Sequence, residues 1–95
     1  MATYIMLTRL TDKGAETIKE HPGRIEAVAK EMEGFGVKVV AQYSVLGPFD
    51  FVNVIEAPDN ITVARISAEL ASRGSVRIQT LPAMPVSEFI TKFRK

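Results

Sequence analysis

Residues 49–57 constrain the fold of this chain more than any other segment, and they read Phe-Asp-Phe-Val-Asn-Val-Ile-Glu-Ala. The alternation is typical of a β-strand that is apolar on both faces, with Val52 and Val54 on one side and Phe51 and Ile55 on the other. A strand with two apolar faces needs cover on both sides. We assign Val52 and Val54 to a face under helices, and Phe51 and Ile55 to a face that meets a further layer. Because both faces are apolar, the pattern alone hides the register.

The remaining segments supply the other elements of a small α+β domain. The expected strands are residues 3–10, 37–46, 49–57 and 75–81, and the expected helices are residues 14–33, 59–73 and a short one from about residue 85. His21-Pro22-Gly23 predicts a kink or a division into two short helices. Gly47-Pro48 predicts a hairpin between the two central strands.

The order β-α-β-β-α-β, followed by a C-terminal helix, is that of the ferredoxin-like plait. Right-handed crossovers place both long helices on one face of an antiparallel four-stranded sheet. A chain of 95 residues has the length of one such domain, so we expect a single domain over residues 1–95.

The face of the sheet that carries no helices predicts self-association. A soluble monomer seldom exposes a large apolar patch, and a second copy would cover it in a two-fold homodimer. In the alternative arrangement the C-terminal helix folds across this face, with Phe89 and Phe93 on its apolar stripe.

Composition removes several classes of function. The chain has no cysteine, which excludes disulfides, thiol catalysis and cysteine-ligated metals. Twelve basic and eleven acidic residues are scattered along it without a basic cluster, so a nucleic-acid partner is not expected. The N-terminus lacks a signal-peptide pattern, and no apolar run approaches the roughly 20 residues of a membrane span. We therefore expect a cytoplasmic protein without a membrane partner.

Four polar residues are candidates for binding a small molecule. Tyr43, Asn53 and Arg77 interrupt apolar strands, and we expect them to point into the interior of a closed barrel; each could instead lie at a strand edge in water. Asp50 could bind a ligand amine or polarise a substrate. It could equally accept amide hydrogens within the turn motif Gly47-Pro48-Phe49-Asp50.

No catalytic residue can be assigned from the sequence. His21, the single histidine, could act as a general base or haem ligand, or lie in solvent at the helix break. One histidine without cysteines or clustered carboxylates predicts no metal site, and no glycine-rich phosphate loop is present. The sequence therefore indicates no cofactor.

The hairpin and its surroundings resemble the GYD domain family. The similarity is carried by Tyr43-Ser44-Val45-Leu46-Gly47-Pro48-Phe49-Asp50-Phe51-Val52, Glu56-Ala57-Pro58-Asp59, Thr3-Tyr4-Ile5-x-Leu7, Thr11, Gly14 and Gly74-x-Val76-x-x-x-Thr80. Phe49 stands where the Gly-x-Tyr-Asp signature has tyrosine, so a phenolic hydroxyl is absent there. The family is similar to dimeric α/β-barrel proteins, in which two open plaits close face to face, and its biochemical role is uncharacterised.

The same hairpin is similar to the effector-binding half of leucine-responsive-type regulators, which bind small metabolites between subunits. These resemblances favour a homo-oligomeric module that binds or senses a small molecule. A cofactor-light barrel enzyme (an oxygenase, an isomerase or a haem-handling protein) and a purely structural assembly protein are the alternatives. Whether the chain is an enzyme is therefore left open.

Overall fold

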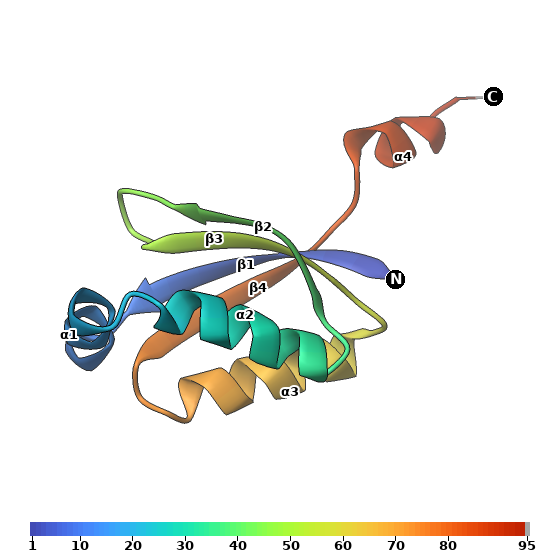
Figure 1. Ribbon diagram of the computed structural model, residues 1–95. Helices are drawn as coiled ribbons and strands as arrows, with labels where there is room; N and C mark the ends of the chain where they lie inside the picture. Colours follow the sequence, from blue (N-terminus) through green and yellow to red (C-terminus); the bar gives the residue numbers. More distant parts are fainter. Residues whose placement is uncertain (95) are drawn as a thin grey trace.

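A computed structural model describes residues 1–94 of the chain. Its elements are β1 (Ala2–Leu10), α1 (Asp12–Glu20), α2 (Arg24–Gly34), β2 (Lys38–Ser44), β3 (Phe51–Ala57), α3 (Asn60–Ala71), β4 (Val76–Ala83) and α4 (Val86–Thr91). The strands form one antiparallel sheet in the order β2-β3-β1-β4. Helices α2 and α3 lie side by side against one face of it (Figure 1). The predicted ferredoxin-like α+β plait is confirmed.

The predicted interruption at residues 21–23 divides the first helical region into two helices. α1 ends at Glu20, His21 caps it, and α2 begins at Arg24. Pro22 has no backbone N–H to donate to a preceding carbonyl, so one helix cannot run through it unbroken. In Figure 1, α1 is seen almost end-on at one end of the sheet, whereas α2 runs along the sheet. The two helices therefore point in different directions.

The hydrophobic core lies between the sheet and the pair α2 and α3. Its buried members are Tyr4, Met6, Met32, Val37, Ile55, Ala57, Val63, Ile66 and Leu70.

The faces of β3 are the reverse of our prediction. Ile55 is completely buried in this core and pairs across the sheet with Tyr4, whose hydroxyl donates to Asn60 Oδ1 at 2.5 Å, at the start of α3. Phe51 shares that side of β3, so Val52 and Val54 point away from the helices. The pattern could not decide between the faces because both carry large apolar residues. The faces are assigned by the cross-strand pairing of Ile55 with Tyr4, a residue of the core.

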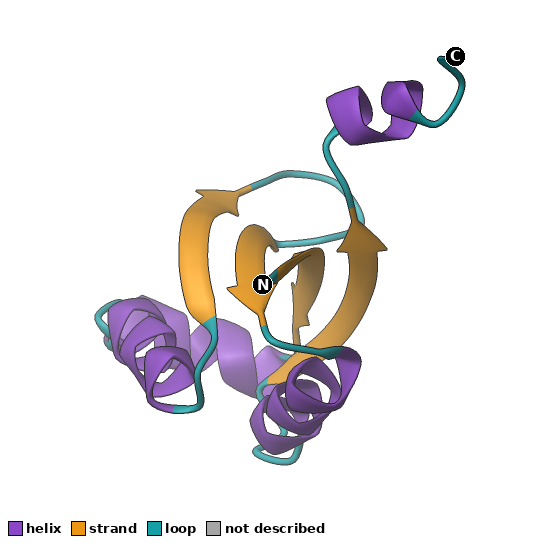
Figure 2. Ribbon diagram, turned by 90° about the vertical axis from the view of Figure 1, so that its right-hand side faces the viewer, coloured by secondary structure: helices purple, strands orange, loops and turns teal. Residues whose placement is uncertain are grey.

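The face away from the helices is covered by no other element among residues 1–94. Cross-strand pairs place one set of side chains on it, which we call the open face. Its apolar members are Ile5, Leu7, Ala41, Tyr43, Val52, Val54, Leu81 and Ala83, and its polar members are Thr3, Arg9, Lys38, Glu56, Arg77 and Gln79. Tyr43 is 59% exposed and Leu81 is 51% exposed. Figure 2, viewed along the sheet, shows α1, α2 and α3 together on the other side.

The C-terminal arm, residues 84–94, stands clear of the rest of the chain (Figures 1 and 2). The Cα radius of gyration is 14.5 Å, against about 12 Å for a compact domain of this length. Phe89 and Phe93 are exposed, and their ring centroids lie 5.1 Å apart. The alternative in which the C-terminal helix covers the sheet of its own chain is therefore wrong.

Candidate functional site

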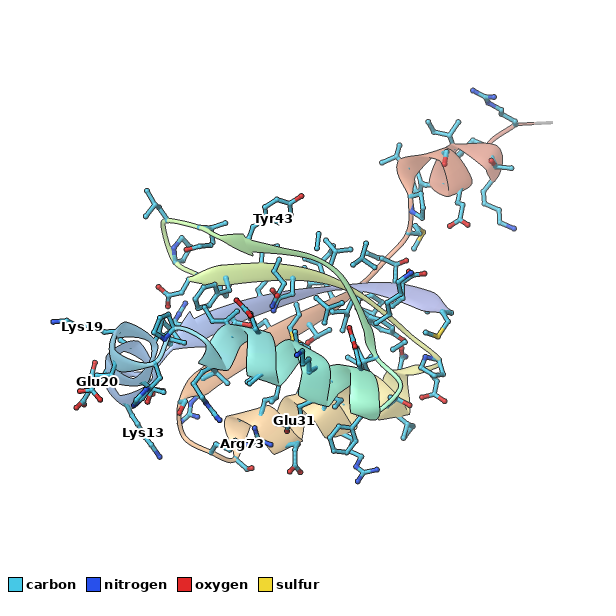
Figure 3. The ribbon with its side chains drawn as sticks, in the orientation of Figure 1. Lys13, Lys19, Glu20, Glu31, Tyr43 and Arg73 are labelled. Atoms are coloured by element: carbon cyan, nitrogen blue, oxygen red, sulfur yellow. The ribbon has the colours of Figure 1, made fainter. Side chains whose placement is uncertain are left out.

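The structure does not bring the four candidate ligand-binding residues together. Tyr43 lies on the open face, and Figure 3 shows it pointing away from the helices. Arg77 is exposed on β4 and pairs with Arg9 of β1, on the same face as Tyr43. Asn53 lies on the opposite face, beneath the helices, and Asp50 lies in the hairpin.

The hairpin motif is hydrogen-bonded to the end of β1. Asp50 Oδ2 accepts from the Leu10 backbone N–H at 2.7 Å, and the Asp50 N–H donates to the Thr8 carbonyl at 2.8 Å. Arg9 donates from Nε to the Pro48 carbonyl at 3.0 Å, and its guanidinium lies 5.5 Å from the centre of the Phe49 ring. Gly47 has φ of +106°, which glycine adopts at little cost. These contacts hold the hairpin against the neighbouring strand.

We predict different outcomes for two substitutions of Asp50. Asp50→Ala should lower the free energy of unfolding by about 1–3 kcal/mol, because the Leu10 N–H loses its acceptor. Asp50→Asn should retain most of that stability, since the amide oxygen can still accept the bond. Urea denaturation of both variants measures the difference. Equal losses for the two would show that the carboxylate charge, and not this hydrogen bond, is what matters at position 50.

A cavity of about 120 Å³ lies between the sheet, α1 and α2. Its walls are mainly apolar and include Ile18 of α1 together with Ile25 and Val28 of α2. Thr8 of β1 and Asn53 of β3, both only 7% exposed, contribute polar groups from the sheet.

Asn53 lines this cavity and carries an unsatisfied polar atom. Its Oδ1 is buried and has no hydrogen-bond partner among the residues that the structure describes. We expected Asn53 to face the interior of a barrel, that is, the open face. It pairs with Met6 of β1, a core residue, and so points under the helices. The predicted direction of Asn53 was therefore wrong, as it was for Ile55, because both faces of β3 carry apolar residues and the pattern does not assign them.

The sequence pattern did not predict the cavity itself. Two signals were available: the proline that separates α1 from α2, and the polar residues Thr8 and Asn53 at positions facing apolar helices. Arg24 and Arg73, which line the cavity at its helical side, were not predicted at all.

An ion pair fixes one side of the cavity. Arg73, between α3 and β4, donates to both carboxylate oxygens of Glu31 on α2, with Nη1 at 3.0 Å from Oε2. Figure 3 shows the two side chains between α2 and α3. The hydrogen bond from Arg73 holds the pKa of Glu31 below its ordinary value, against the opposing effect of desolvation.

This pair predicts an acid-sensitive contribution to stability. Because the folded-state pKa of Glu31 is lowered, the contribution is present above the ordinary pKa, near 4.5, and is lost as the pH falls through the folded-state value. Both side chains are about a third exposed, so we expect only about 0.5–1 kcal/mol. Glu31→Gln should lose that amount at pH 7, and the difference from wild type should shrink toward pH 2. Glu26→Gln, on the same helix, is the control, and a pH-independent difference for Glu31→Gln would contradict the prediction.

Residues 1–94 contain neither a metal-binding cluster nor a membrane-spanning helix. No group of three or more His, Cys, Asp or Glu side chains is arranged to hold a metal ion in that range. No helix there is long and apolar enough to cross a membrane. His21 is exposed at the end of α1.

The strand pairing, the placement of the helices on one side of the sheet, and the hairpin between β2 and β3 define the class of the protein. It is a ferredoxin-like plait with one uncovered face. Comparison with known proteins identifies its family: the chain belongs to the GYD domain family, whose model matches residues 4–92. It is 57% identical over 95 residues to a protein of Thermus thermophilus named "Glutamine synthetase and cystathionine beta-lyase binding protein", and the match covers 99% of this chain and 100% of the relative. The crystal structure of TTHA0845 from the same organism has a similar fold, with a TM-score of 0.58 at 24% identity over 90% of this chain and 95% of that one.

Proposed function

We propose that this chain is an enzyme-binding protein whose partners are a glutamine synthetase and a cystathionine β-lyase. The observation that supports the proposal is its 57% identity to a relative named for binding these two enzymes. The match includes the whole relative, so every segment with which the relative could bind an enzyme has a counterpart here.

A homodimer is the assembly that we propose for this role. Ile5, Leu7, Val52 and Val54 form an apolar patch on the two central strands of the open face, and apolar patches of this kind mark interaction sites. A second copy presents the same face, so a two-fold axis lets each sheet cover the other. Tyr43 and Arg77 would then lie between the subunits, where their role in binding a ligand stays a prediction. We further propose that residues 1–95 act as one domain and that the protein works in the cytoplasm.

The C-terminal arm is the surface that we propose for the enzymes. Val86, Phe89 and Phe93 are exposed on it, and the arm extends away from the core on the side of the sheet opposite α2 and α3 (Figure 1). Its helix spans six residues, and so short a helix is marginal in water without a partner. Phenylalanine is also among the residue types that are enriched in protein interfaces relative to the rest of the surface.

Binding to purified enzymes tests this function. The chain should be immobilised and exposed to glutamine synthetase and cystathionine β-lyase of its own organism, with an unrelated enzyme as control. We expect binding of the first two and a loss of at least about tenfold in affinity for Phe89→Ser. Ile61→Ser, which removes an exposed apolar side chain from α3 instead of the arm, is the matched control and should bind like wild type. No binding of either enzyme by the wild-type chain would refute the proposal.

Small-molecule binding is a second candidate function, and one observation favours it: the cavity is lined by Asn53, whose buried Oδ1 has no hydrogen-bond partner. A ligand at a hundred times its dissociation constant adds about 2.7 kcal/mol to the free energy of unfolding. A panel of metabolites screened by thermal shift would detect such a ligand. A panel without any shift would remove the support for sensing while leaving enzyme binding untouched.

A further inference from the structure

We propose that the cavity between the sheet, α1 and α2 binds a small uncharged molecule with an apolar body and one N–H or O–H group, which donates to Asn53 Oδ1. This inference names the site and the ligand chemistry of the small-molecule binding proposed above and rests on that proposal. It is independent of the enzyme partners.

Asn53 Oδ1 is a buried hydrogen-bond acceptor without a partner. A buried acceptor without a partner costs about 1–3 kcal/mol, and the large majority of buried polar side-chain atoms have a partner. Asn53 lies on the central strand β3, between the paired residues Met6 of β1 and Gln42 of β2. Met6 has no hydrogen to donate from its side chain, and Gln42 is exposed. A donor that enters the cavity would satisfy Oδ1.

The shape and size of the cavity limit the ligand to a small molecule with an apolar body. Apolar side chains from three elements line the space, which is open to solvent on one side: Met6 of β1, Ile18 of α1, and Ile25 and Val28 of α2. An apolar cavity of about 150 Å³ is large enough for benzene. At about 120 Å³, this cavity suits a slightly smaller molecule with an apolar body.

The side chains that line the cavity favour a ligand without a net charge. An ionised group in this apolar space would lose its hydration without a buried counter-charge. Arg73 at the wall is already hydrogen-bonded to Glu31 through both carboxylate oxygens. Arg24 also lines the cavity but is exposed to solvent. The chemistry therefore favours a neutral ligand over a carboxylate or an ammonium ion.

Pyrrole and furan are a matched pair of probes for this site. Both are small apolar rings of nearly the same shape, but only pyrrole carries an N–H donor. Each should be titrated into the wild-type protein while the methyl NMR signals of Met6 and Met32 are followed, since both residues line the cavity. We expect both probes to shift these signals, with pyrrole binding about fivefold more tightly, as one hydrogen bond would provide.

Two variants separate the hydrogen bond from the cavity. Asn53→Leu keeps a side chain of similar size and should fold stably because it removes the unsatisfied amide; it should bind both probes equally. Val28→Phe fills the space from the helix side and should bind neither probe.

Either of two results would overturn the inference. One is the absence of any shift at Met6 and Met32, as expected for a cavity that holds only water. The other is a pyrrole preference that persists in Asn53→Leu. The metabolite panel is scored separately: a panel ligand that leaves the Met6 and Met32 signals unmoved would support small-molecule binding but refute this site.

Discussion

Gly14→Ala is expected to lower the free energy of unfolding by about 3 kcal/mol. A Cβ atom at position 14 would lie 2.0 Å from the backbone carbonyl oxygen of Ser75, closer than any real contact of this kind. That carbonyl cannot simply move aside, because it accepts a hydrogen bond from the Thr11 N–H at 3.0 Å. The Thr11 hydroxyl donates in turn to the Gly74 carbonyl at 2.7 Å. Adding one methyl group would therefore force α1 away from the loop before β4.

Gly23→Ala is the matched control for this substitution. A Cβ atom at Gly23 would meet no atom within 4 Å, and its φ of −63° suits any residue. We expect its urea denaturation midpoint to equal or slightly exceed that of the wild-type protein. If Gly14→Ala is as stable as Gly23→Ala, α1 does not pack against the residue 74–75 loop as described.

Lysine substitutions at neighbouring positions of β3 are expected to have opposite consequences. Ile55→Lys places a charge in the core, where no partner can compensate it, and should unfold the subunit. Val54→Lys places the charge on the open face and should leave a folded monomer. We expect the proposed dimer to lose much of its stability, because one buried apolar side chain is worth about 1.5–3 kcal/mol and a two-fold axis places each substitution in the interface twice.

Circular dichroism and sedimentation together distinguish these outcomes. Ala64→Lys, on the exposed side of α3, is the control and should remain both folded and dimeric. A Val54→Lys protein that still sediments as the wild-type dimer would show that the open face is not the interface. Unfolding by Val54→Lys with a folded Ile55→Lys would reverse the assignment of the two faces.

Local patterns were sufficient to predict the elements and their order. Gly47-Pro48 and Pro22 mark the turn and the helix break because their effects on the backbone do not depend on the rest of the fold. The direction of each β3 side chain could not be predicted in this way. Val52, Val54, Phe51 and Ile55 are all apolar, and only the tertiary pairing of Ile55 with Tyr4 assigns the faces.

The candidate site depends on contacts between distant segments, which limits what a sequence pattern can reveal. Asn53 is recognisable in the sequence as an unusual polar residue in an apolar strand, but its cavity is lined by residues from segments that lie far apart in the sequence. Asp50 was given two roles, and its bond to the Leu10 N–H joins positions forty residues apart in sequence. The ion pair of Glu31 with Arg73 likewise joins residues with no local relation.

Sedimentation velocity of the fluorescently labelled chain, alone and with glutamine synthetase of its own organism, measures both self-association and enzyme binding. Alone, the chain should sediment as a dimer, with an apparent mass twice that of the 10.5 kDa chain. With the enzyme in excess, the labelled boundary should move with the enzyme, and unlabelled chain should displace it. A label that sediments at the same rate with and without glutamine synthetase, and likewise with cystathionine β-lyase, would show that the chain binds neither enzyme.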